Sequence, residues 1–308
     1  MKKLLLGVAL SVLVSSVANA GTIGVSIAFT NTYLTKMRKA MEQEAKAQNQ
    51  PLTVEIANSD VNTQISQIQN FVAAKVDAII VYAIDTSTTA SMTKLAQDAG
   101  IPIVYVNSQP IDIDQLGPKG AFVGSNESES GTLETKEVCR LLKEAGKSTV
   151  AIIQGDLRNQ AAIQRTKDIH DVIATDECSF MKVIQQQAPG WDPVKAQDLM
   201  TNWIAAGIKP DAVIANNDDQ AVGAIRAMAA AGWDPKEVVV AGIDATAEAL
   251  SYMKQGDLDV TIYQDAAGQG RAAVTTAMKL AKGEKVDSKV WIPFQLVTPA
   301  NMNDFVQK

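Results

Sequence analysis

Residues 78–107 read AIIVYAIDTSTTASMTKLAQDAGIPIVYVN and contain one complete strand–helix–strand unit. Residues 78–82 form the short apolar run of a buried β-strand, residues 86–99 have the length of a helix, and residues 103–107 return to a β-branched run. The Gly-Ile-Pro sequence at positions 100–102 ends the helix and starts the next strand. Two strands connected through a helix predict a parallel pair in an α/β fold.

The same alternation extends over most of the chain. Further strands are expected at 22–29, 52–57, 121–123, 149–154, 181–184, 212–215, 238–243 and 260–263. Helices are expected at 33–48, 62–74, 129–144, 160–174, 193–206, 219–231, 247–254 and 268–282. About ten strands over this length favour two doubly wound parallel-sheet lobes over a single sheet. Since no linker rich in Pro, Gly or Ser separates the halves, we expect the chain to cross between the lobes several times.

The first twenty residues carry an export signal and are not expected to belong to the fold. Two lysines precede an apolar run at 4–14, and the segment ends in Ala18-Asn19-Ala20, a small-x-small sequence that signal peptidases cut. The apolar run is too short to span a bilayer, which takes roughly 20 residues. We therefore expect residues 1–20 to be a cleaved signal peptide and the mature protein to be located in the periplasm.

Charge and cysteine content narrow the choice of partners. The chain carries 28 Lys and Arg against 34 Asp and Glu, and loss of the signal peptide would leave a net charge of −8. Such a protein repels nucleic acid and anionic membrane surfaces. Cys139 and Cys178 are too far apart in sequence for a metal motif. In an oxidising compartment a disulfide between them is expected, with two separate buried thiols as the alternative.

Candidate binding residues lie directly after the predicted strands, because ligands of open parallel sheets bind outside the carboxyl ends of the strands. Amides, carboxylates, one arginine and aromatic rings gather there, whereas His, Cys and Lys are missing. Paired amide, carboxylate and guanidinium groups suit neighbouring hydroxyls, and a Trp or Tyr ring can cover the apolar face of a sugar. These positions are Asn31, Tyr33, Asp60, Asp85, Asn107, Asn159, Arg165, Trp191, 216–218, Asp244, Gln264 and Asp265.

Helix capping is the competing interpretation for the Asn and Asp residues in this set, since both residue types cap helices and form turns. We prefer that interpretation for Asp60 and Asp85. Trp191 and Arg165 are not capping residues, so they argue most strongly for a binding site. We expect the ring of Trp191 to stack on the ligand, with a place in the core of the lobe as the alternative.

Four segments carry a family resemblance: 33–44 (YLTKMRKAMEQE), 191–192 (WD), 215–223 (ANNDDQAVG) and 241–244 (AGID). Through them the mature chain resembles the ribose- and galactose-binding proteins, the type I periplasmic binding proteins. The resemblance implies two lobes joined by a hinge of several crossings. The expected N-terminal lobe comprises 21–124 plus 265–290, and the expected C-terminal lobe comprises 125–264 plus 291–308.

The resemblance also implies a function: capture of a monosaccharide, polyol or cyclitol between the lobes and delivery to the membrane permease of an ABC importer. Some relatives present the closed form to a chemoreceptor as well. We expect a monomer, with no enzymatic activity. The expected ligand-binding residues are Asn31, Tyr33, Asn107, Ser108, Asn159, Arg165, Trp191, Asn217, Asp244 and Gln264.

At several binding positions the sequence differs from the ribose- and galactose-binding relatives, so the identity of the ligand stays open. Asn107-Ser108 stands where ribose-binding relatives have Asp-Arg, and Asn31 stands where galactose-binding relatives have Asp. Asn159 and Ala161 replace a His and an Asp of the galactose-binding proteins. No Asp- and Asn-rich calcium loop is found, so no metal ion is expected.

Two other classes of function fit less well. An enzyme would need a nucleophile or an acid–base pair, but His170, the only histidine, lies in a predicted helix without such a partner. Since neither a dinucleotide motif nor a phosphate loop is present, no cofactor is expected. A sugar-responsive repressor would need a DNA-binding helix-turn-helix and a basic face, and the acidic, exported chain offers neither.

Overall fold

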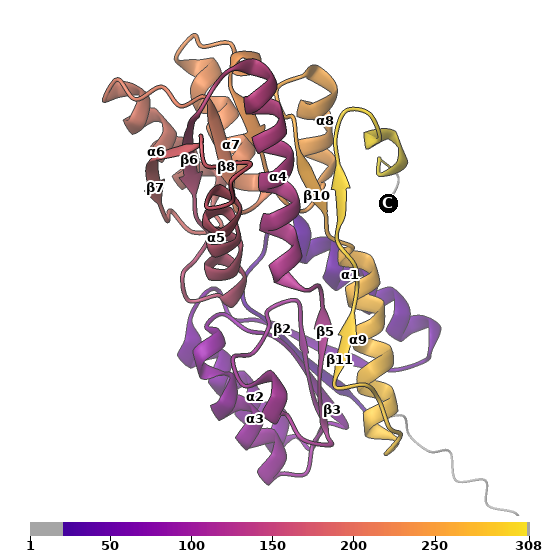
Figure 1. Cartoon of the computed structure of the whole chain (residues 1–308). Coiled ribbons are helices and arrows are strands. Elements are labelled where there is room, and N and C mark those ends of the chain that lie inside the picture. The colour runs from indigo at the N-terminus through magenta and orange to yellow at the C-terminus, as the bar shows by residue number, and fades with distance from the viewer. Residues whose placement is uncertain (1–20, 307–308) are drawn as a thin grey trace, which may run out of the picture.

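The computed structural model describes residues 21–306, so the predicted signal peptide lies outside the described residues. Two parallel sheets, each covered by helices, form two lobes that lie end to end (Figure 1). This is the predicted type I architecture. Within the described residues, no helix combines the length and apolarity that a membrane crossing requires.

The first lobe is built on a six-stranded sheet with the order β11-β5-β4-β3-β1-β2 and parallel pairing throughout. Helices α1 and α9 pack on one face and α2 and α3 on the other, which is why β1 and β3 are buried along their whole length. The strands are β1 (Ile23–Ile27), β2 (Leu52–Ile56), β3 (Ala78–Tyr82), β4 (Ile103–Val106), β5 (Gly120–Gly124) and β11 (Lys289–Trp291). The helices are α1 (Thr32–Ala47), α2 (Val61–Ala73), α3 (Thr89–Asp98) and α9 (Ala266–Ala281).

The second lobe is built on a four-stranded parallel sheet with the order β7-β6-β8-β9. Helices α6, α7 and α8 cover one face, and α4 and α5 cover the other. Its strands are β6 (Thr149–Ile153), β7 (Lys182–Gln187), β8 (Ala212–Ala215) and β9 (Val239–Ala241). Its helices are α4 (Glu127–Ala145), α5 (Gln160–Ile173), α6 (Pro193–Ala205), α7 (Asp218–Ala230) and α8 (Ala247–Gln255).

Within residues 21–306 the chain passes between the lobes three times, at 124–127, 263–266 and 291–295. The short antiparallel pair of β10 (Thr261–Tyr263) and β12 (Gln295–Val297) supports the last two passages.

The expected boundary assigned Trp291 to the second lobe, but Trp291 pairs with Gly124 in the first sheet. Its ring also meets that of Phe122 edge to face, with the centroids 5.7 Å apart. The sequence analysis missed β11 and β12, because their three-residue sequences KVW and QLV do not lie in longer apolar runs like those that contain β9 and β10.

A disulfide joins Cys139 in α4 to Cys178 before β7, with the Cα atoms 5.8 Å apart. Both residues are buried in the cluster that packs α4 and α5 on the second sheet. The bridge therefore ties α4, which begins at the first passage between the lobes, to the segment before β7, an edge strand of the second sheet.

Candidate ligand-binding site

A pocket lies between the lobes, where the carboxyl ends of the two sets of strands face each other. About 340 Å³ of space within it is free of protein atoms, part of which is open to solvent. Both lobes contribute to its wall: Phe29, Asn31, Tyr33, Leu34, Tyr82 and Asn107 from the first, and Ala161, Arg165, Trp191, Asn217, Asp244 and Gln264 from the second.

Eight of the ten expected binding residues line this pocket. Ser108 and Asn159 do not. The Asn159 Nδ2 donates a hydrogen bond of 3.1 Å to the Ser108 Oγ, and the Ser108 Oγ donates to the carbonyl of Ala83 at 2.9 Å. The Thr86 N–H also donates to the carbonyl of Arg158 across the same gap, at 2.9 Å. Ser108 and Asn159 therefore join the two lobes beside the pocket.

Helix capping and pocket lining coincide at Asn31 and Asn217. Asn31 caps α1 and accepts from the Leu34 N–H at 2.8 Å, while Asn217 caps α7 and accepts from the Gln220 N–H at 3.0 Å. Each cap engages the side-chain oxygen and holds the amide in one orientation, which leaves the Nδ2 donor for the pocket. By contrast, Asp60 and Asp85 cap α2 and the short 3₁₀ helix Thr86–Thr88 outside the pocket, as expected.

The first-lobe wall is a neutral hydrogen-bond network. The Asn107 Nδ2 donates to the Tyr33 hydroxyl at 3.1 Å and to the Gln269 Oε1 at 3.0 Å, and the Tyr33 hydroxyl donates to the same Oε1 at 3.0 Å. Asn107 has a φ of 61°, in the left-handed region that Asn tolerates better than most residues. Burial, followed by the negative charge of Asp244, raises the pKa of Tyr33, so the phenol stays protonated and can donate and accept.

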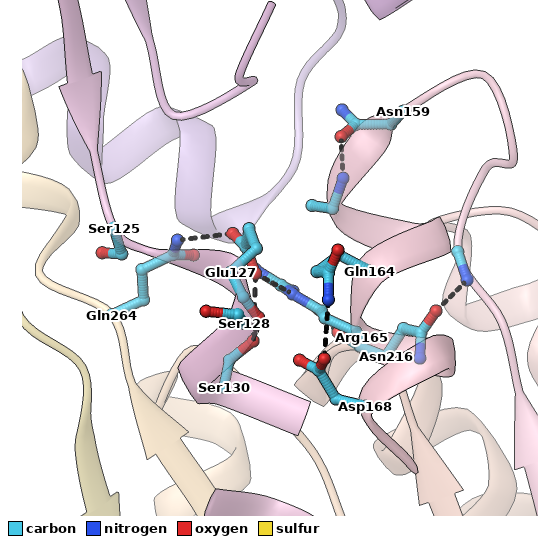
Figure 2. A network of polar contacts seen from close by, with 12 residues as sticks. Ser125, Glu127, Ser128, Ser130, Asn159, Gln164, Arg165, Asp168, Asn216 and Gln264 are labelled. Carbon is cyan, nitrogen blue, oxygen red and sulfur yellow. Dashed lines mark hydrogen bonds and ion pairs between the residues drawn. The ribbon is translucent and has the colours of Figure 1, made fainter. Parts of the chain in front are cut away.

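The second-lobe wall is built around a buried ion pair (Figure 2). The Arg165 Nε donates to the Glu127 Oε2 at 2.7 Å, and the Arg165 Nη2 donates to the Glu127 Oε1 at 2.9 Å. The Arg165 Nη1 donates to the carbonyl of Asn216 at 2.8 Å. Burial acts to lower the pKa of Arg165, but the contacts with Glu127 outweigh it and the net shift is upward. Arg165 thus carries its charge in a site where it is only 4% exposed.

Asp244 is the acidic group that faces Arg165 across the pocket wall. Its φ of 129° is rare for a side-chain-bearing residue, a strain that accompanies many functional sites. Burial raises the pKa of Asp244 well above its ordinary value, and Arg165 partly opposes that shift. Asp218 lies behind it and accepts from the Thr246 N–H and the Thr261 hydroxyl, both at 2.7 Å. Burial raises the pKa of Asp218 to about 6.

Aromatic rings supply the apolar part of the wall. Trp191 lies over Gly155, where a Cβ atom would sit 2.1 Å from the indole ring, so only glycine leaves room for it. The Arg165 Cζ lies 5.8 Å from the centroid of the same ring. Trp191 is half-buried and belongs to the pocket wall. Phe29 and Tyr82 add two further rings, 6.1 Å apart and nearly perpendicular.

Sequence reasoning missed Glu127, Gln269, Phe29 and Tyr82. Phe29 lies two residues after β1, at the end of the predicted strand 22–29, and Tyr82 is the last residue of β3, so their residue types indicated core. Gln269 and Glu127 each lie in the first turn of a helix, where polar residues are ordinary. No signal in the sequence names Arg165 as the partner of Glu127, because the two residues are far apart along the chain.

The assembled groups can bind a compact polyhydroxylated ring. Amides and two phenols can donate and accept, and one guanidinium and one carboxyl can each engage adjacent hydroxyls. Four aromatic rings are available to cover C–H faces. None of the described residues that line the pocket is a histidine, cysteine or lysine. Among the described residues, no group of three or more His, Cys, Asp or Glu side chains could hold a metal ion.

Comparisons with known proteins point the same way. Residues 23–285 match the model of the periplasmic binding protein domain. A protein of Rhizobium meliloti, provisionally named a rhizopine-binding protein, is 54% identical over 310 residues and covers 100% of both chains. The xylitol-binding protein of Mycolicibacterium smegmatis is 31% identical, over 93% of this chain and 80% of that protein.

A solved structure extends the likeness to three dimensions. The ABC transporter solute-binding protein of Bacillus halodurans with bound myo-inositol superposes with a TM-score of 0.87 and is 39% identical. The match covers 94% of this chain and 98% of that one. Fold, family model and relatives agree, and the chain therefore belongs to the type I periplasmic binding protein family.

Proposed function

We propose that this protein captures a cyclitol or a related sugar or polyol between its lobes and delivers it to the permease of an ABC importer. One observation carries the proposal: polar side chains from both lobes converge on one small, ring-lined pocket. A ligand that touches both walls favours the closed arrangement of the lobes. The permease can then distinguish the closed, ligand-bound protein from the open, ligand-free protein.

The ligand class is supported by the relatives and by the residues of the pocket. The relatives at 54% and 31% identity are named for rhizopine and xylitol, and the similar structure at 39% identity holds myo-inositol, none of which is a pentose or hexose. Relatives at 25% to 28% identity are named for ribose and galactose. The Asp-Arg pair of ribose-binding proteins is replaced by Asn107-Ser108, and Ser108 contacts the other lobe in place of lining the pocket. A cyclitol is therefore our first candidate, and monosaccharides and open-chain polyols are the second.

The remaining parts of the proposal follow from the sequence and the family. We propose that residues 1–20 are cleaved during export to the periplasm and that the mature protein acts as a monomer. The eight predicted residues that line the pocket would contact the ligand. The two lobes would move relative to each other about the three passages of the chain between them. The last of these passages would start after Trp291. Presentation to a chemoreceptor is a second possible use of the same closed form. Because a binder leaves its ligand unchanged, we propose no reaction.

A thermal-shift screen over inositols, pentoses, hexoses and polyols tests the proposal. A ligand at 100 times its Kd should add roughly 2.7 kcal/mol to the free energy of unfolding. Calorimetric titration of each hit should give one site per chain, and chromatography should recover the ligand unchanged. A screen without hits would contradict the ligand class, and turnover of a hit would indicate an enzyme.

A further inference from the structure

Glu127 is a fully engaged carboxylate directly behind the pocket wall. It is the first residue of α4, where the helix N-terminus favours a negative charge. Its Oε2 accepts from the Arg165 Nε at 2.7 Å and from the Ser130 hydroxyl at 3.0 Å. Its Oε1 accepts from the Arg165 Nη2 at 2.9 Å and lies 3.5 Å from the Gln264 Nε2 (Figure 2). With a side chain only 1% exposed, Glu127 does not line the pocket itself.

The close approach of α4 and α5 brings Glu127 to Arg165. Gly131 follows Glu127 by one helical turn and therefore lies on the same face of α4. A Cβ atom at Gly131 would lie 2.5 Å from the carbonyl oxygen of Arg165 and 2.9 Å from the Cβ of Asp168. Only a glycine at this position lets the two helices pack so closely. The pairing of Glu127 with Arg165 is therefore built into the contact between the helices.

The ion pair with Glu127 compensates the positive charge of Arg165 but leaves some of its N–H donors free. A guanidinium has five N–H groups, and Arg165 uses two of them on Glu127 and one on the carbonyl of Asn216. The other two can serve a ligand, since Arg165 lines the pocket. Among the described residues that line the pocket, the acidic Asp244 is the only other one with an ionisable carboxyl or cationic side chain. Hydroxyl groups of a neutral ligand can bind to the two free N–H donors. A carboxylate in the ligand would also need a cation to balance its charge, and the charge of Arg165 is already balanced by Glu127.

We propose that Glu127 is a specificity-determining residue: by neutralising Arg165 it restricts the pocket to ligands without a negative charge. This inference rests on the proposed function, because it concerns which polyols the same site accepts. Burying an anion without a matching cation is unfavourable, and here it would also lie near Asp244. Without the charge of Glu127, the same guanidinium would become a bidentate site for a carboxylate.

The test compares neutral ligands with their acidic counterparts. We would titrate the protein with myo-inositol and quinate, D-glucose and D-glucuronate, and D-galactose and D-galacturonate. The wild type should bind the best neutral ligand at least about 100-fold more tightly than its acid. E127Q should shift that ratio towards the acid by at least about tenfold, equivalent to ~1.4 kcal/mol. E127D, which keeps the charge, should retain the preference of the wild type.

Two results would overturn the inference while leaving the proposed function intact. One is a wild type that binds an acid as tightly as its neutral counterpart. The other is an E127Q variant that loses affinity for both ligands by the same factor, as expected of a residue with a purely structural role. Failure of the wild type to bind any neutral polyol or acid would overturn the proposed function and the inference together.

A second variant keeps the test decisive if E127Q fails to fold, since that substitution leaves Arg165 buried and unpaired. The double variant E127Q/R165Q carries no charge at either position and should reject acids as the wild type does, although it should bind neutral ligands more weakly. Circular dichroism melting of each variant would report its folding. Tight binding of acids by the double variant would contradict the proposed role of the guanidinium charge.

Discussion

The two walls of the pocket follow opposite designs. The first-lobe wall is a network of neutral groups, in which the pocket residues Asn107 and Tyr33 share hydrogen bonds with the buried Gln269 behind them. The second-lobe wall buries Arg165 with Glu127 and places Asp244 beside them. A neutral hydrogen bond contributes about 1 kcal/mol, whereas a broken buried ion pair costs about 3–5 kcal/mol. Substitutions in the second lobe should therefore have the larger effects on both stability and binding.

The largest effect is expected for R165A. It removes two N–H donors from the pocket and leaves Glu127 buried without its partner, which should lower the free energy of unfolding by about 3–5 kcal/mol. Affinity for the ligand found in the screen should fall at least about 100-fold. Denaturant unfolding and calorimetry measure the two quantities. The matched control is R140A on the exposed face of α4, which should change neither by much. Unchanged affinity in both R165A and D244A would place the binding site elsewhere.

Removal of the disulfide should separate stability from binding. The double variant C139S/C178S frees a segment of about 40 residues, and the chain-entropy model predicts a loss of up to about 4 kcal/mol in the free energy of unfolding. The bridge lies away from the pocket, so affinity per folded molecule should be unchanged. Thiol titration of the unfolded, unreduced wild type should find no free thiol. Detection of two thiols would show that the bridge does not form in the cell.

The third effect concerns the aromatic part of the second-lobe wall. Replacing Trp191 by alanine should weaken ligand binding by about 2 kcal/mol, because we propose that this ring of the pocket wall stacks on the apolar face of the ligand. Tryptophan emission of the wild type should change on ligand binding, and this change should disappear in the variant. W233A, which removes a tryptophan outside the pocket, is the control. Loss of stability without loss of affinity would instead assign Trp191 to the support of the lobe.

The smallest effect should come from the neutral wall. Y33F removes one hydroxyl that donates to Gln269 and accepts from Asn107, so affinity should fall about tenfold or less. The free energy of unfolding should change by about 1 kcal/mol. Y252F, which removes a hydroxyl at the surface of α8, is the control. A loss from Y33F as large as that from R165A would contradict the contrast between the walls.

Much of the site was predictable because strand ends in a parallel sheet converge on one edge. Asn31, Tyr33 and Asn107 follow strands of the first sheet, and Asn217 and Asp244 follow strands of the second. All of them line the pocket. Ser108 and Asn159 have equally suitable residue types and positions, but they bond to each other across the lobes. Whether such a residue meets the ligand or the other lobe depends on a few ångströms of tertiary placement.

The sequence alone determined the alternation of strands and helices, the two lobes and most of the polar residues at the strand ends, since these depend on local periodicity and on the topology of parallel sheets. Only the tertiary structure decided that Glu127 pairs with Arg165, that Gln269 orients Tyr33 and Asn107, and that Trp291 belongs to the first sheet. Each of these contacts joins residues more than 35 positions apart in the chain. Such pairs are selected by the packing of whole helices and strands, which no local pattern of residues records.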